Sequence, residues 1–301
     1  MRAYRKAAAF YLGFLFMILA VFAASLATAM AEEAKTVVYH TVTAKTTDQA
    51  IDLGSYQVTG LDEFMAFLDQ LPALTQVDMY ESTLNAAQLE TLSKRYPNIL
   101  FGWTLTMGDH KIRTDVTAFS TLHNHKSPAH TSADVAVLKY CKNLLALDLG
   151  HNAITDISFL NELPNLRILI LGRNRIKDAS PIGTLKDLEY LELFSAGVSD
   201  VSALENCTKL KDLNISNNKI KDLSPVLTLP ELERLWLCGS QNGILNGNSF
   251  TKKQKQEITA QVTPGCLVNF TGAGTQAGWR NHPRFNVLYE IFQTGIYRPW
   301  E

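Results

Sequence analysis

Histidines in the middle of the chain come closest to a group of residues that could do chemistry. They are His110, His123, His125, His130 and His151. His123 and His125 share one face of an extended segment, and with another histidine such as His130 they could bind zinc. A zinc site needs a third or fourth ligand at fixed geometry, whereas the residues between these histidines are those of a plain loop. The sequence therefore favours solvated or capping histidines over a metal site.

Four aspartates at a constant spacing are a second candidate. They are Asp156, Asp178, Asp200 and Asp222. Carboxylates stacked at strand spacing could bind calcium, but Ca²⁺ takes about six to eight oxygen ligands and one carboxylate per repeat is a thin set. The simpler interpretation is that each carboxylate accepts backbone N–H bonds at a turn. We predict no metal site.

Motifs of catalysis are absent from the sequence. It contains no H-E-x-x-H, G-x-S-x-G, P-loop or G-x-G-x-x-G pattern. The repeats and caps described below leave no span long enough for a separate catalytic domain. We therefore predict no enzyme, no catalytic residues and no cofactor. The alternative is an enzyme or metal-binding protein that uses the His123/His125/His130 loop.

The aspartates belong to a longer repeat, which defines the fold. Apolar triplets spaced L-x-x-L-x-L begin at positions 144, 166, 188, 210 and 232, a constant step of 22 residues. A fixed period of about 20–29 residues with this pattern is the signature of a leucine-rich-repeat solenoid. Apolar and polar residues alternate in each triplet, which predicts a short strand with one buried face, and successive strands pair in parallel. The predicted fold is α/β, with a parallel β-sheet on the concave face, short helices and turns on the convex face, and helix-plus-strand caps at both ends.

The rest of the repeat follows the form N-x-[IV]-x-D-[ILVA]-S-[PA]-[LIV], in which the asparagine closes the turn after the strand, with Ala196 as the exception in the asparagine column. This form resembles the 22-residue repeats of bacterial internalin-like proteins and of more ordinary secreted leucine-rich-repeat proteins of Gram-positive bacteria. In those proteins a segment like 103–122 precedes the regular repeats, and a tail like 278–301 follows them. The resemblance implies a surface-exposed binding module and names no ligand.

The N-terminus has the pattern of a secretory signal peptide. Three basic residues among the first six precede an apolar run at 7–24 and an Ala29-Met30-Ala31 site. We predict secretion with cleavage after Ala31; the alternative is an uncleaved segment 7–24 that anchors the protein to the outer face of the cytoplasmic membrane. Cleavage removes three of 28 Lys and Arg residues and none of 29 Asp and Glu residues, leaving 25 against 29, a net charge of −4. This balance argues against nucleic acid as a partner.

After the signal peptide (1–31) we predict one continuous domain. Its segments are a poorly ordered lead at 32–53 with one strand near 37–42, an irregular N-terminal cap with degenerate repeats at 54–143, regular repeats at 144–240, a capping helix and strand at 241–277, and an aromatic tail at 278–301. The four cysteines, Cys141, Cys207, Cys238 and Cys266, are expected to be free thiols that pack as small hydrophobic residues. One Cys238–Cys266 disulfide is the alternative.

Residues that flank the buried leucines of each strand must point out of the concave face. A solvated sheet has no need of large apolar residues there, and apolar residues ringed by charges are typical of an interaction surface. We predict that this face binds a protein or glycan partner. The predicted binding residues are Ile168, Ile170, Tyr190, Glu192, Phe194, Arg234 and Trp236. The alternative is that the C-terminal tail folds over them.

The tail is unusually aromatic, with Trp279 near its start and Trp300 near its end. We predict a flap whose helix, at about 286–292, packs its apolar residues against the end of the solenoid. The alternative is a displaced recognition arm.

Overall fold

The computed structural model describes residues 34–82, 84–121, 129–239, 248–271 and 278–300. The chain divides into two compact units, residues 1–101 and 102–301. The predicted signal peptide lies outside the described residues, as do His123 and His125.

The first unit contains strands where the sequence predicts a poorly ordered lead. Strands β1 (Thr36–Tyr39) and β2 (Val42–Lys45) form an antiparallel hairpin. The prediction is wrong for residues 34–53 because Val37, Tyr39, Val42 and Ala44 alternate with polar residues and are buried. Tyr39 packs against Phe64 and Phe67 of the next helix, so the hairpin has a hydrophobic surface to cover.

The remainder of the first unit alternates strands and helices as expected for degenerate repeats. Strands β3 and β4 pair in parallel, and β5 completes a three-stranded sheet. Helix α3 begins at a capping box in which the Asn85 side chain accepts the Gln88 N–H. The elements are β3 (Ala50–Asp52), α2 (Leu61–Leu68), β4 (Gln76–Asp78), α3 (Ala86–Arg95) and β5 (Leu100–Gly102).

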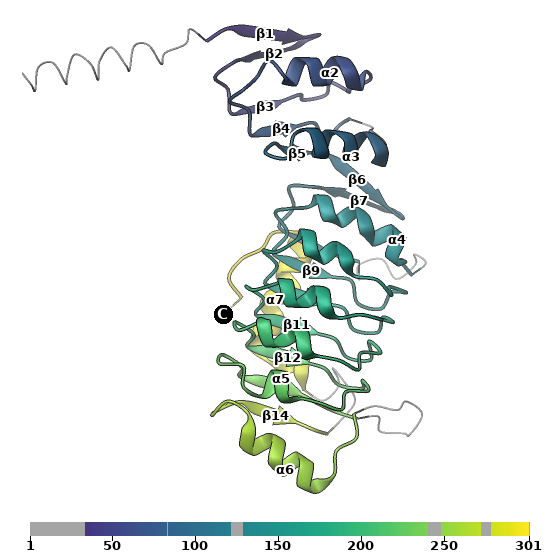
Figure 1. Cartoon of the computed structure of the whole chain (residues 1–301), viewed down its shortest axis with the longest axis vertical. Coiled ribbons are helices and arrows are strands. Elements are labelled where there is room, and N and C mark those ends of the chain that lie inside the picture. The colour runs from purple at the N-terminus through teal and green to yellow at the C-terminus, as the bar shows by residue number, and fades with distance from the viewer. Residues whose placement is uncertain (1–33, 83, 122–128, 240–247, 272–277, 301) are drawn as a thin grey trace, which may run out of the picture. The chain divides into compact units, whose positions relative to one another are not determined.

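The second unit is built on a seven-stranded parallel sheet with the order β14-β13-β12-β11-β10-β9-β8 (Figure 1). Strands β9 to β13 pair in the register that the 22-residue step predicts, for example Ile168 with Tyr190, whereas β8 and β14 at the two ends pair in parallel outside that step. The strands are β8 (Ala118–Ser120), β9 (Ala146–Asp148), β10 (Ile168–Ile170), β11 (Tyr190–Glu192), β12 (Asp212–Asn214), β13 (Arg234–Trp236) and β14 (Leu267–Asn269). The predicted solenoid is confirmed.

Short helical turns form the convex side, and the leucine columns are buried between them and the sheet. The asparagine column closes the coils that carry it: the Asn174 side chain donates to the carbonyls of Leu149 and Leu171 and accepts the Ile154 N–H. The convex elements are α4 (Ser132–Val135), η1 (Ala136–Tyr140), η2 (Ser158–Glu162), η3 (Ser180–Thr184), η4 (Ser202–Asn206) and α5 (Ser224–Leu227). Helix α6 (Lys252–Gln261), before β14, is the predicted C-terminal capping helix. An antiparallel hairpin of β6 (Thr104–Met107) and β7 (His110–Arg113) precedes β8.

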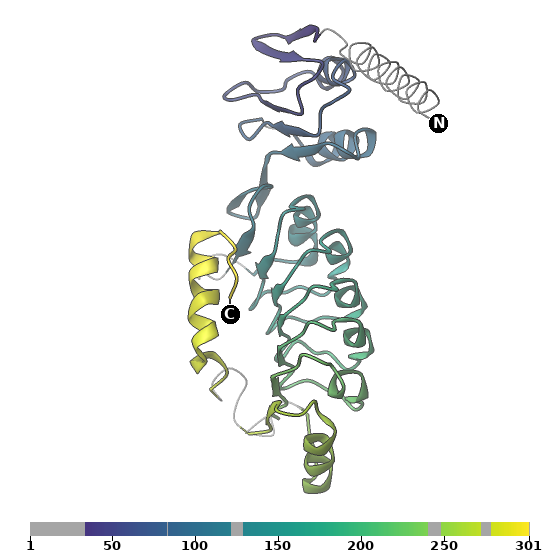
Figure 2. The same cartoon turned by 90° about the vertical axis from the view of Figure 1, so that its left-hand side faces the viewer.

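The C-terminal segment adds a third layer to the second unit. After the turn η6 (Trp279–Asn281), helix α7 (Pro283–Thr294) runs along the concave side of the sheet, opposite the convex turns (Figure 2). The Ala118 N–H donates to the Gly295 carbonyl at 3.2 Å, so the end of α7 reaches β8. The expected position of the helix, against the end of the solenoid, is therefore wrong, because its apolar residues Leu288, Ile291 and Phe292 pack with residues of the concave strands.

Candidate functional site

The seven predicted binding residues are all buried in the structure. Six lie on the concave strands β10, β11 and β13, and Phe194 follows β11. None is more than 6% exposed, and Glu192 has no exposed surface. The sheet thus presents this face to the C-terminal segment of the same chain (Figure 2). Whether these residues bind a partner stays a prediction.

Aromatic and aliphatic side chains of the C-terminal segment form a second core with the concave strands. Trp279 lies between Tyr190 and Trp236, with ring centroids 5.5 Å and 5.1 Å away, and Trp300 meets Tyr190 edge-on at 5.7 Å. Helix α7 contributes Leu288, Ile291 and Phe292 to the same cluster. Large rings with complementary edges and faces are the contacts that dominate interfaces, and here they join parts of one chain.

Glu192 is the polar centre of this contact. Its Oε1 accepts hydrogen bonds from the Tyr190 hydroxyl and from the Trp279 indole Nε1, the latter at 2.8 Å. Its Oε2 accepts a bond from the Arg280 guanidinium at 2.9 Å. Burial raises the pKa of Tyr190 well above its usual value, and the neighbouring Glu192 charge adds to this shift. A fully buried carboxylate is tolerated because every bond it needs is supplied, two of them by the C-terminal segment.

Asp212 forms a second buried ion pair one strand away. It accepts a hydrogen bond from Arg234 at 2.9 Å and lies 3.5 Å from Arg284 of α7. Burial raises the pKa of Asp212, and the two arginines oppose that shift. The Arg234 guanidinium also donates to the Trp279 carbonyl at 2.7 Å and lies 4.4 Å from the centre of its indole ring. Arg234 therefore binds a sheet carboxylate and the C-terminal segment at once.

Phe194 is separate from this cluster. It packs against Gly172, where an added Cβ would lie 2.3 Å from the phenyl ring, and its ring centroid is 6.2 Å from that of His151. The structure thus brings together six of the seven predicted residues. The sequence analysis did not assign Trp279, Arg280 and Arg284 to the site. The unusually aromatic composition of the tail is the signal that could have pointed to this segment.

Comparison with protein families identifies the repeats. A sequence profile for pairs of leucine-rich repeats matches residues 142–183, 164–206 and 208–249. These coils are leucine-rich repeats. Comparison with curated protein sequences gives no match. Among the part of the chain that the structure describes, no helix is both long and apolar enough to cross a membrane.

Solved structures similar to this chain include two internalins. Internalin C2 of Listeria monocytogenes is 23% identical over 76% of this chain and 85% of its own, with a TM-score of 0.39. Internalin InlF of the same species is 20% identical over 71% of this chain and 68% of its own, with a TM-score of 0.34. A leucine-rich-repeat protein of Leptospira interrogans is 22% identical over 75% of this chain and 55% of its own, with a TM-score of 0.43.

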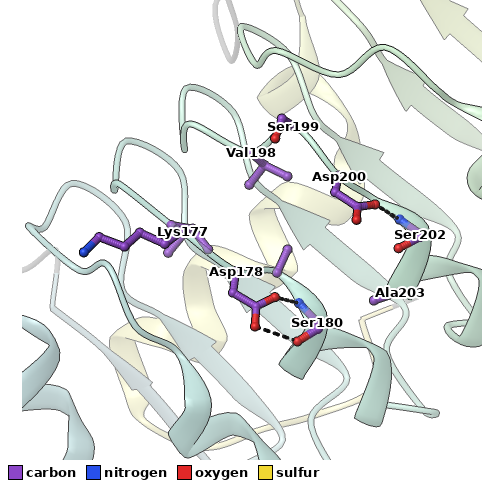
Figure 3. A pocket seen from close by; sticks show the side chains of 10 residues that line it. Lys177, Asp178, Ser180, Val198, Ser199, Asp200, Ser202 and Ala203 are labelled. Atoms are coloured by element: carbon purple, nitrogen blue, oxygen red, sulfur yellow. Dashed lines mark hydrogen bonds between the residues drawn. The ribbon is translucent and has the colours of Figure 1, made fainter.

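The aspartate column of the leucine-rich repeats serves the backbone. The Oδ1 atoms of Asp156, Asp178 and Asp200 each accept the N–H of the serine two residues later at 2.8 Å, and Asp222 does the same at 2.9 Å. Figure 3 shows two of these turns lining a pocket of about 190 Å³, with each carboxylate bonded to its own serine. This arrangement matches the interpretation that each carboxylate accepts a backbone N–H at a turn. Each coil still has only one carboxylate in this column that could bind an ion.

The cysteines and one histidine are also placed. All four cysteines are free thiols, and burial raises the pKa of Cys141 to about 12. The Cys238 thiol donates to the Thr271 carbonyl at 3.0 Å, so it has a partner without a disulfide. His130 is buried, 5% exposed, so of the two roles that the sequence favours for these histidines, solvated or capping, it does not have the solvated one.

Replacing Asp148 with asparagine is expected to stabilise the protein at pH 8, raising the melting temperature by about 5 °C. Burial raises the pKa of Asp148 to about 7, with the Glu192 charge adding to the shift and the Gly150 N–H bond opposing it. A raised carboxyl pKa means that the native state holds a proton that the unfolded chain has released, so the native state loses stability as pH rises from about 4 to about 7.

An asparagine at 148 keeps the geometry, since its amide oxygen can accept the Gly150 N–H and its amide nitrogen can donate to Ser120. Thermal unfolding across pH 4–8 measures the effect. The gain in melting temperature should grow with pH and level off above about 7. A gain that does not change with pH would contradict the raised pKa of Asp148.

Proposed function

We propose that this protein is a secreted protein-binding module whose partner site is the concave sheet of the leucine-rich repeats. Proteins with this fold typically mediate protein–protein interaction. The observation that carries the proposal is that the concave strands already bind a polypeptide segment, residues 278–300 of the same chain. A polypeptide in the site favours a protein partner over the glycan alternative.

The contacts of the segment define what a partner has to supply. Tyr190, Trp236 and Arg234 are the residue types that dominate protein interfaces. A partner needs an aromatic side chain with an N–H donor for Glu192, as Trp279 has, and cations for Glu192 and Asp212, as Arg280 and Arg284 have. The proposed ligand is therefore a segment rich in tryptophan and arginine.

The C-terminal segment competes with such a partner. A tethered competitor acts at an effective concentration of about millimolar for a short linker, so it lowers the apparent affinity of the partner. Binding then requires release of residues 278–300, and the partner is favoured only if it binds the sheet more tightly than the segment does. In this scheme residues 278–300 cover the concave residues until a partner that binds the sheet more tightly displaces them.

The outer side of α7 is a second candidate surface for the same function. Tyr289 is 53% exposed there, and Ile296, just after the helix, is 67% exposed. Exposed large apolar residues can mark an interaction surface that uses the closed form. This candidate requires the segment to stay in place.

Affinity capture from native surroundings with three baits is expected to separate the two surfaces. The baits are the full protein, a variant ending at Ala277, and the full protein with Tyr289→Ser and Ile296→Ser. The concave site predicts at least tenfold more partner on the shortened bait and no change on the double variant. A partner that is lost from the double variant and absent from the shortened bait would contradict the concave site.

Secretion is part of the same proposal. The apolar run at 7–24 and the Ala29-Met30-Ala31 site support export and cleavage, with membrane anchoring through 7–24 as the alternative. Protein in the extracellular fraction that begins at Glu32 is the expected result, whereas an intact leader in the membrane fraction would favour anchoring.

A further inference from the structure

We propose that Asp109, His110 and His130 bind a Zn²⁺ ion. One ligand atom from each of the three side chains lies within 4.8 Å of the other two. His130 comes from the histidine loop considered above, and in the structure its imidazole lies beside the β6–β7 turn. The His110 ring packs edge-on against Phe119 of β8, with ring centroids 5.5 Å apart, and none of the three ligands is among the seven predicted partner-binding residues.

The β6–β7 hairpin places two of the ligands. Gly108 and Asp109 form the turn, and His110 is the first residue of β7. Gly108 has a φ of 59°, which a glycine adopts without strain. An added Cβ at this position would lie 2.7 Å from Cε1 of His130, so the missing side chain lets the turn approach the imidazole closely.

The first coil of the solenoid places the third ligand. The His130 N–H donates to the Asn152 side chain at 2.9 Å, and the His130 carbonyl accepts the Ala153 N–H at 2.9 Å. Asn152 belongs to the asparagine column, so the repeat itself fixes the backbone of His130. Two elements about 20 residues apart in the chain are thereby held against each other.

Unpaired nitrogens are the second observation that points to a ligand. Nε2 of His110 and Nε2 of His130 are both buried without a hydrogen-bond partner. The His130 side chain is nine-tenths buried or more, at 5% exposure, and its ring centroid is 5.2 Å from that of His110. A buried polar atom without a partner costs about 1–3 kcal/mol, and two at one place need an explanation. A bound cation provides one, because it takes the lone pairs of both rings.

The stereochemistry fits zinc with modest adjustment. Tetrahedral Zn²⁺ has bonds of about 2.0–2.2 Å to nitrogen and oxygen, so its ligand atoms lie about 3.4 Å apart. Nε2 of His110 and Oδ1 of Asp109 are already 3.6 Å apart. The Asp109 side chain is 44% exposed in the turn, which leaves it room to rotate toward the ion.

The chemistry of the donors selects the class of metal. Imidazole nitrogen with one carboxylate suits Zn²⁺, whereas Ca²⁺ and Mg²⁺ prefer an all-oxygen shell. Three protein ligands leave a fourth position for water.

Zinc titration of the protein, produced with its own leader and purified without a polyhistidine tag, is the test. We expect one Zn²⁺ per chain in a competition assay with a metal indicator, and a rise in melting temperature of about 5–10 °C at a hundredfold excess over the dissociation constant. Ca²⁺ should give no rise. Absence of stoichiometric Zn²⁺ binding in the folded protein would overturn the proposal.

Variants locate the ion. His110→Ala and His130→Ala are each expected to weaken Zn²⁺ binding by more than tenfold. Because His130 is buried and its variant can fail to fold, Asp109→Asn is the second measurement: it changes an exposed side chain and is expected to weaken binding about tenfold.

Two controls decide between this site and other histidines. His151→Asn, at an exposed position whose φ of 62° asparagine accepts, should bind Zn²⁺ with unchanged affinity. The double variant His123→Ala with His125→Ala should also retain it. Loss of binding in either control, with full binding in Asp109→Asn, would overturn the assignment.

Discussion

Removal of residues 278–301 is expected to lower the melting temperature by about 5–10 °C, a loss of about 2–4 kcal/mol for a protein of this size. The segment fills the concave side with Trp279, Trp300 and the apolar side of α7, all of which are buried. Their loss exposes the rings of Tyr190 and Trp236 to water. Calorimetry or thermal circular dichroism of the two forms gives the difference.

The expected loss is less than the sum of the contacts, for two reasons. The shortened chain no longer has to order the segment, which recovers conformational entropy. Glu192 and Asp212 lose their arginine partners from the tail but regain water, so they are not left as buried unpaired charges. Arg298→Ala, a change at an exposed residue of the tail, is the matched control and should leave the melting temperature unchanged. An unchanged melting temperature in the shortened protein would instead favour a displaced recognition arm.

The second large effect is expected when the segment is supplied as a separate peptide. A synthetic peptide of residues 278–301 should bind the variant ending at Ala277, and Tyr190→Ala with Trp236→Ala should weaken that binding more than tenfold, or about 1.4 kcal/mol. The two side chains provide the ring contacts to Trp279. Isothermal titration or fluorescence anisotropy gives both dissociation constants.

The shortened protein is the right background for this double variant. The sequence predicts that the two substitutions leave the fold intact, which presumes exposed side chains. In the full protein Tyr190 is 1% exposed and Trp236 is 4% exposed, so truncating them there also opens cavities. Phe194→Ala is the aromatic control, because Phe194 is buried outside the cluster: it should cost stability and keep the peptide affinity. If Phe194→Ala weakens peptide binding equally, the loss of affinity in the double variant comes from general destabilisation and not from the loss of contacts in the site.

The sequence by itself determined the repeat, the strand register and the direction of the side chains. The 22-residue step fixes which residues of β9 to β13 lie side by side, and alternation within a strand fixes that Tyr190 and Glu192 share the concave face. The lead at 34–53 was misjudged because its short alternating strands depend on Phe64 and Phe67 for a surface to pack on.

Only the tertiary structure decided what covers the concave face and which histidine meets which carboxylate. The Trp279 indole binds Tyr190 across a separation of 89 residues, and no periodic pattern links the two positions. His130 faces Asp109 and His110 because a hairpin turn and a solenoid coil meet there. Periodicity determines contacts between neighbouring repeats, whereas contacts made by a non-repeating segment depend on shape and charge matching between surfaces that exist only after the repeats have folded.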